Sequence, residues 1–115
     1  MKLVLASQSP RRSDLLRLAG FSFQVRSRPV EEIRGQEEAP RDYTLRLARS
    51  KAEAAWEGGT EVVLGADTIV VLGGRVLEKP ADAADARRML EALSGRSHTV
   101  ITGICLRHRL DHQRK

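Results

Sequence analysis

Two hydroxyl groups and two guanidinium groups lie close together near the N-terminus, on Ser7, Ser9, Arg11 and Arg12. Residues 2–6 predict a short buried strand, and Ser9-Pro10 predicts the start of a helix that ends at Ala19. Free backbone N–H groups and the helix dipole favour an anion at such a junction, and arginine forks match polyphosphate oxygens. The pattern therefore indicates a phosphate-binding site, although an ordinary serine cap with solvated arginines has the same residues.

Lys51 stands out from the other basic residues of a second predicted helix, which begins at Pro40 and ends at about residue 57. On a helical wheel, Lys51 and Thr44 fall amid the apolar arc of that helix. The arc contains Tyr43, Leu47, Ala48, Ala52 and Ala55. A lysine there extends to solvent, pairs with an acid or meets a ligand, because burial of an unpaired ammonium is costly. The apolar surroundings favour a role in a cleft over simple extension to solvent.

Asp67 is the first candidate for an acid that activates water. It follows the aliphatic run 61–66, which predicts a central strand, and open α/β sheets present ligand-binding groups at strand ends. A carboxylate there can hold a divalent ion or act as a base, and Thr68 beside it is a substrate-binding candidate. A turn or capping aspartate fits the same position. His98 is a rival base by residue type, but its place before a predicted strand favours packing or capping.

Further charged residues lie on the predicted segments next to the N-terminal serines and arginines, Lys51 and Asp67. Lys79-Pro80 follows a hairpin predicted at Gly73-Gly74, and Glu31-Glu32 lie on the charged segment before Pro40. Singly, each is more often a solvated surface group. Together, the cations and carboxylates describe a basic pocket suited to phosphoanhydride cleavage, in which Mg²⁺ or a similar ion bridges phosphate oxygens and Asp67 orients or deprotonates water.

The order of predicted elements indicates an α/β fold. Strands are expected at 2–6, 21–26, 61–66, 69–72, 75–77 and 99–106, and helices at 9–19, 40–57 and 82–94. The charged stretch that ends at Ala39 lacks a helical stripe and predicts a loop. Because strands alternate with helices, we expect a mixed twisted sheet with flanking helices.

Composition restricts the class of protein. The 115 residues fit one domain, and a hydrophobic fraction of 41% argues against disorder. No apolar run approaches membrane-spanning length, and the lone Cys105 has no partner for an internal disulfide, so a cytoplasmic location is expected. The net charge of +5 favours anionic partners, but one Trp, one Tyr and two Phe are few for a nucleic-acid module.

The ordered motifs resemble those of the Maf proteins, septum-formation-associated nucleoside triphosphate pyrophosphatases related in fold to the inosine triphosphate pyrophosphatases. The resemblance is carried by LVLASQSPRRSDLLRLAGF, P-x-x-Y-x-x-x-L-A-x-x-K-A at Pro40 to Ala52, GADTIV, Lys79-Pro80 and MLEALSGRSHTVITG. It implies hydrolysis between the α and β phosphates with Mg²⁺, Mn²⁺ or Co²⁺, and a homodimer. The SPRR form is similar to the branch that acts on dTTP and UTP, rather than on 7-methyl-GTP.

The resemblance also implies roles for individual residues. Asp67 would be the catalytic base, and Glu32 would help Asp67 to bind metal or water, with the adjacent Glu31 as the alternative. The phosphate cleft would be lined by Ser7, Arg11, Arg12, Lys51 and Lys79. With Ser9 and Thr68, which the local patterns add, these are the residues expected to bind substrate.

Members of the family usually continue beyond the T-G strand, with further strands and a helix that close a second lobe. Here LRHRLDHQRK does not resemble that continuation. We therefore expect residues 1–106 to form the N-terminal part of a Maf-like domain, residues 107–115 to form a basic tail, and apolar surface to be exposed. The alternatives are a short form that binds nucleotides or acts as a septation-related regulatory protein, and, last, a nucleic-acid module that uses the tail.

Overall fold

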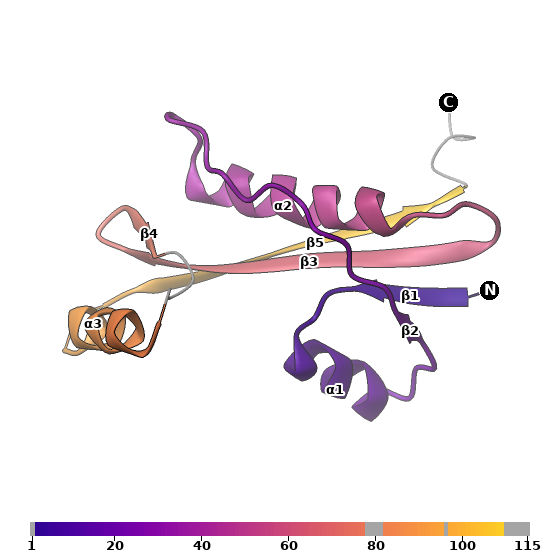
Figure 1. Cartoon of the computed structure of the whole chain (residues 1–115), viewed down its shortest axis with the longest axis horizontal. Coiled ribbons are helices and arrows are strands. Elements are labelled where there is room, and N and C mark those ends of the chain that lie inside the picture. Colours follow the sequence, from indigo (N-terminus) through magenta and orange to yellow (C-terminus); the bar gives the residue numbers. More distant parts are fainter. Residues whose placement is uncertain (1, 78–81, 96, 110–115) are drawn as a thin grey trace.

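The sheet is organised around one long strand. The computed structural model describes residues 2–77, 82–95 and 97–109 (Figure 1). The elements follow in the order β1 (Lys2–Ala6), α1 (Pro10–Leu18), β2 (Gln24–Val25), α2 (Pro40–Ala55), β3 (Glu61–Leu72), β4 (Arg75–Leu77), α3 (Ala83–Leu93) and β5 (Thr99–His108). The predicted mixed sheet with flanking helices is confirmed.

The two edges of β3 are paired differently. β5 pairs antiparallel with β3 from Val62 to Val71, along one whole edge. On the other edge, β1 runs parallel to residues 61–65 and β4 runs antiparallel to residues 70–72. Within the described parts of the chain, residues 66–69 have no strand partner on that second edge. This gap lies at the carboxyl end of β1, the position at which parallel sheets present ligand-binding groups.

The strand end expected before Asp67 is wrong. β3 continues through Asp67 to Leu72 because β5 pairs with it residue by residue across that stretch. The hairpin prediction is confirmed, with Gly73 and Gly74 at φ values of 56° and 81°, a conformation that glycine adopts without strain. The strand whose carboxyl end presents ligand-binding groups is therefore β1. Asp67 lies in the middle of β3, beside that end.

Two other strand bounds differ from the predictions. The strand expected over 21–26 is limited to Gln24–Val25, which pair with the short β1. β5 extends to His108 instead of ending at Leu106. Arg107 is held there by an ion pair with Glu53, with 2.8 Å between Nε and Oε1 but without hydrogen-bond geometry, and its guanidinium lies 4.3 Å from the centroid of the Trp56 ring.

Helix α2 covers one face of the sheet (Figure 1). Its predicted apolar arc is the buried one, and it packs against Val4, Val63 and Ile69. A Cβ atom on Gly65 would lie 2.2 Å from the carbonyl oxygen of Ala48, so only glycine lets the helix backbone approach β3 this closely. This close packing places the side chains of α2 directly over the middle of β3.

The opposite face of the sheet is partly uncovered. Several large apolar side chains are exposed there and on α1, namely Leu15, Leu18, Val100, Ile104 and Leu106. Helix α3 lies at one end of the molecule and contains no buried residue (Figure 1). The expectation of exposed apolar surface is confirmed. Among the described residues, no helix has the length and apolar character needed to cross a membrane.

Candidate active site

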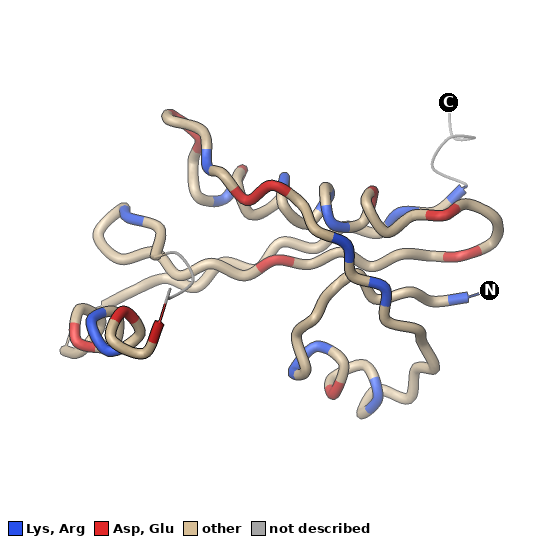
Figure 2. Tube along the Cα trace, in the orientation of Figure 1, with Lys and Arg blue, Asp and Glu red and all other residues tan. Residues whose placement is uncertain are grey.

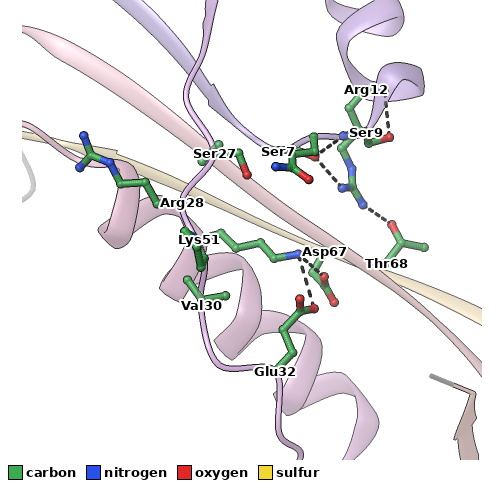
Figure 3. A pocket seen from close by; sticks show the side chains of 13 residues that line it. Ser7, Ser9, Arg12, Ser27, Arg28, Val30, Glu32, Lys51, Asp67 and Thr68 are labelled. Carbon is green, nitrogen blue, oxygen red and sulfur yellow. Dashed lines mark hydrogen bonds and ion pairs between the residues drawn. The ribbon is translucent and has the colours of Figure 1, made fainter. Parts of the chain in front are cut away.

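A cavity of about 570 Å³ opens at the gap between β1 and β4 (Figure 3). Its lining comes from the end of β1, the start of α1, the segment after β2, one side chain of α2 and the middle of β3. Most of the predicted site residues line this cavity: Ser7, Ser9, Arg12, Glu32, Lys51, Asp67 and Thr68. The fold thus brings together residues that are spread over a 62-residue stretch, 7–68.

Arg12 is fixed in the cavity by two separate hydroxyl groups. One guanidinium nitrogen donates to Ser7 Oγ at 3.0 Å, and the other donates to Thr68 Oγ1 at 2.7 Å. Thr68 Oγ1 also lies 3.1 Å from Thr102 Oγ1, which links the contact to β5. The backbone N–H of Arg12 donates to Ser9 Oγ at 3.4 Å, which makes Ser9 the predicted cap of α1. The guanidinium is therefore held in place at the anion-favouring end of a helix.

Lys51 lies between two carboxylates. Its Nζ donates to Asp67 Oδ1 at 2.7 Å and lies 3.8 Å from Glu32 Oε1. The side chains of Lys51 and Asp67 are 17% and 8% exposed, so most of this charge pair is shielded from water. Of the three alternatives for Lys51, the structure therefore shows pairing with acids inside a cleft (Figure 3).

The segment that carries Glu32 is attached to the rest of the fold near β2. Arg26 donates to the backbone oxygen of Ala55 at 2.7 Å and pairs with the buried Glu61 at 3.0 Å. The hydrogen bond to Glu61 raises the pKa of Arg26. Burial by itself raises the pKa of Glu61, but the hydrogen bonds from Arg26 and from the backbone N–H of Glu57 leave that pKa lowered. Arg28, farther along, donates to the backbone oxygen of Ala54 and pairs with Glu57.

Charge changes sign along this crossing segment. Figure 2 shows basic residues where the segment crosses the strands and acidic residues farther along, beside α2. Within the acidic part, both Glu31 and Glu32 are exposed, but only Glu32 lines the cavity. Of the two alternatives, Glu32 is therefore the one that borders the cavity.

Other predicted residues lie elsewhere. Arg11 is exposed and lines a second, more apolar hollow of about 790 Å³ on the uncovered face, because one step along α1 turns its side chain away from the cavity. Lys79 lies outside the described residues. His98 is exposed before β5 and does not line the cavity. Of the two roles expected for it, packing is wrong and capping stays a prediction.

The sequence reasoning missed one wall of the cavity. This wall contains Ser27, Arg28, Pro29 and Val30, and Gln8 of the β1–α1 turn is a further lining residue that was missed. The parallel pairing of β2 with β1 explains the position of this wall, because the carboxyl end of β2, followed by Ser27, emerges beside Ser7. Recognition of that parallel pairing would have placed residues 27–30 at the site.

The carboxylates of the cavity form a small oxygen-donor set. Among the described residues, no group of three or more His, Cys, Asp and Glu side chains is arranged to hold a metal ion. Glu32 and Asp67 nevertheless converge on one cation, the Lys51 ammonium. Two carboxylates suit a hard divalent ion that completes its coordination with water and phosphate oxygens.

The fold and the site define an α/β protein with a cleft that combines fixed cations and paired carboxylates at the end of a parallel strand. The family model described as Maf-like protein matches residues 2–115, and the chain belongs to this family. It is 58% identical over 106 residues to a dTTP/UTP pyrophosphatase of Anaeromyxobacter dehalogenans, a match that covers 92% of this chain and 53% of that relative. A dTTP/UTP pyrophosphatase of Vibrio cholerae is 53% identical over 105 residues, or 90% of this chain and 56% of that relative.

The chain therefore spans about half the length of the curated relatives it matches. Among solved structures, the nucleoside-triphosphatase (dITP/XTP pyrophosphatase) of Mycobacterium abscessus superposes with a TM-score of 0.40 and 18% identity. That match covers 92% of this chain and 72% of the other.

Proposed function

We propose that this chain carries the phosphate-cleaving site of a nucleoside triphosphate pyrophosphatase that converts dTTP or UTP to the monophosphate and pyrophosphate. The observation that carries the proposal is the Asp67 carboxylate, which lies in the same cavity as the fixed cation Arg12 and is paired with Lys51. The names of the relatives support the choice of dTTP and UTP.

Arg12, Ser7 and Ser9 would bind the phosphate chain. The Arg12 guanidinium is already oriented by two hydroxyls, so little ordering is needed when phosphate oxygens bind. Thr68, which accepts a hydrogen bond from Arg12, would contact the same oxygens, and Lys79 remains a predicted contact. Lys51 would stabilise the charge that develops on the phosphates during cleavage.

Asp67 would act as the general base. It orients a water molecule and takes a proton from it as the water oxygen forms a bond to phosphorus. The attacked atom is the α phosphorus. Its bond to the α-β bridging oxygen breaks, and the pyrophosphate leaves with the electron pair of that bond. The near-complete burial of Asp67 limits the number of water molecules that can compete for this position.

Glu32 and Asp67 would hold the divalent ion, Mg²⁺, Mn²⁺ or Co²⁺. The support is the donor set itself, two carboxylates from different segments that already converge on one positive charge. When bound, such an ion neutralises phosphate charge and lowers the barrier to displacement. The chain's own contribution is to keep the two carboxylates facing each other across the cavity.

Pyrophosphate release from purified chain tests the proposal. The panel contains dTTP, UTP, ATP and 7-methyl-GTP, each with Mg²⁺ or Mn²⁺, and the expected result is release from dTTP and UTP. Calorimetry with the same nucleotides separates binding from turnover. Binding of dTTP or UTP without release from a folded sample would contradict the enzymatic proposal and favour the alternative of a nucleotide-binding regulatory protein.

We also expect a homodimer in the cytoplasm. The exposed apolar residues of β5 and α1 support self-association, and the single Cys105 fits a reducing compartment. Light scattering coupled to size exclusion measures the oligomeric state, and a monomer at micromolar concentration would contradict the dimer.

A further inference from the structure

The irregular segment between β2 and α2 is held by α2 at the two carbonyl groups beside the Glu32 side chain. The hydroxyl of Tyr43 donates to the backbone oxygen of Glu32 at 3.1 Å. One guanidinium nitrogen of Arg46 donates to the backbone oxygen of Ile33 at 2.7 Å. Two consecutive peptide groups of a segment without regular structure are thus fixed by side chains one helical turn apart.

Arg46 is itself oriented by an acid of the same segment. Its Nε and a terminal nitrogen donate to the two carboxylate oxygens of Glu38, at 2.7 and 2.9 Å. The N–H of Gly35 donates to Glu38 Oε1 at 3.0 Å, and Arg34 donates to the backbone oxygen of Glu38 at 2.8 Å. The bidentate geometry fixes the plane of the Arg46 guanidinium. The terminal nitrogen that bonds Glu38 is the same one that donates to the backbone oxygen of Ile33.

Tyr43 is fixed at its other end. Its ring is 1% exposed and packs with Leu47 and Ile69 in the core. The hydroxyl of a buried tyrosine needs a hydrogen-bond partner, and here the carbonyl of Glu32 is one. The position of that carbonyl therefore depends on the packing of α2 against β3.

We propose that Tyr43 and Arg46 are positioning residues that set where the Glu32 carboxylate stands relative to Lys51 and Asp67, and so set the affinity of the cavity for a divalent cation. The proposal rests on the metal site of the proposed function. A carboxylate on a loose segment loses conformational freedom when it binds a cation, and a carboxylate on a fixed segment loses less. Figure 3 shows the Glu32 side chain directed toward Lys51 and Asp67 from this segment.

Mn²⁺ binding by the whole chain tests the proposal without any need for turnover. Tyr43→Phe keeps the buried ring and removes only the hydroxyl. Its matched control is Thr44→Val, which removes a neighbouring buried hydroxyl whose bond goes to Pro40 of the same helix. By calorimetry or Mn²⁺ electron paramagnetic resonance, Tyr43→Phe should weaken binding about 10-fold, a usual size for loss of a supporting hydrogen bond. Thr44→Val should bind as the wild type does.

Hydrogen exchange of residues 31–38 provides a second readout, which should show faster exchange in Tyr43→Phe than in Thr44→Val. Faster exchange with unchanged Mn²⁺ affinity would overturn the proposal. The contacts of Tyr43 and Arg46 with the segment would then have only a structural role. Equal Mn²⁺ affinity in Tyr43→Phe and wild type, or no Mn²⁺ binding by the wild type, would also overturn it. Absence of pyrophosphate release, by contrast, would reject the enzymatic function while leaving a weakened Mn²⁺ affinity of Tyr43→Phe in support of the positioning role.

Discussion

The ammonium of Lys51 lies 2.7 Å from Asp67 Oδ1, and this contact joins the helix that covers the sheet to the strand at its centre. The same ammonium lies 3.8 Å from Glu32 Oε1, on the segment that crosses the cavity. One cation therefore compensates two carboxylates from different parts of the chain. Removal of that cation leaves both acids close together without the positive charge between them, and Asp67 is largely shielded from water.

Lys51→Met should lower the free energy of unfolding by about 3 kcal/mol, the low end of the range for breaking a buried pair. Mn²⁺ should restore more stability to this variant than to wild type, because the ion takes the place of the ammonium between the two acids. Thermal unfolding with and without Mn²⁺ measures both effects.

The control for Lys51→Met is Arg17→Met, which removes the exposed pair with Asp14, whose side chains are 63% and 69% exposed. Its cost should stay below about 1 kcal/mol, as for most surface pairs. Equal losses of unfolding free energy in the two variants would show that the Lys51 pair stabilises the fold no more than an exposed pair does.

The two neighbouring arginines of α1 offer a test of nucleotide binding. Arg12→Lys cannot reproduce simultaneous bonds to Ser7 and Thr68, because an ammonium lacks the planar fork, so the Kd for dTTP should rise about 10-fold. Arg11→Lys should leave the Kd unchanged, since Arg11 does not line the cavity. Calorimetric titration with dTTP measures both constants, and a larger effect at Arg11 would contradict this assignment.

This contrast also shows what the sequence could and could not predict. The apolar arc of α2 identified Lys51, because helical periodicity tells which side chains face the sheet. Adjacent residues such as Arg11 and Arg12 point about 100° apart on a helix, and periodicity could not decide which of them faces the cavity. Glu31 and Glu32 were equally ambiguous, because their segment has no repeating geometry.

Contacts between separate segments of the chain were the other feature that could not be predicted from the sequence. Asp67 was expected at a strand end because Ala66 closes the aliphatic run, but the pairing of β3 with β5 carries the strand onward. The hydroxyl bond of Tyr43 was hidden for a similar reason, since its helical spacing predicted only a core residue. The core position of Tyr43 is confirmed, but its hydroxyl contact, like the continuation of β3, depends on a neighbouring segment that local patterns do not encode.

The contact between Glu38 and Arg46 should make stability depend on pH at the acid end. Hydrogen bonds from Arg46, then from the N–H of Gly35, lower the pKa of Glu38 from 4.5 to about 2. A carboxyl with a lowered pKa stabilises the folded form above its ordinary pKa, and this contribution is lost as the pH falls from about 4.5 to about 2. The melting temperature followed by circular dichroism across this interval should therefore fall less steeply in Glu38→Gln than in wild type.

Glu37→Gln is the matched control for that series, because Glu37 is adjacent in sequence and exposed. It should keep the wild-type slope of melting temperature against pH. A slope for Glu38→Gln equal to that of wild type would show that the contact with Arg46 does not persist in solution.

Asp67→Asn is the most direct test of the chemistry. The amide keeps the shape of the side chain but cannot accept a proton from water, so pyrophosphate release should fall by about 10²- to 10⁴-fold, as for loss of a general base. Nucleotide binding should persist, because Arg12 and its partners Ser7 and Thr68 are untouched. Asp14→Asn, at an exposed position on α1, should release pyrophosphate at the wild-type rate. If release by Asp67→Asn matched that of Asp14→Asn, another group would have to activate the water, and Glu32 would be the next residue to replace.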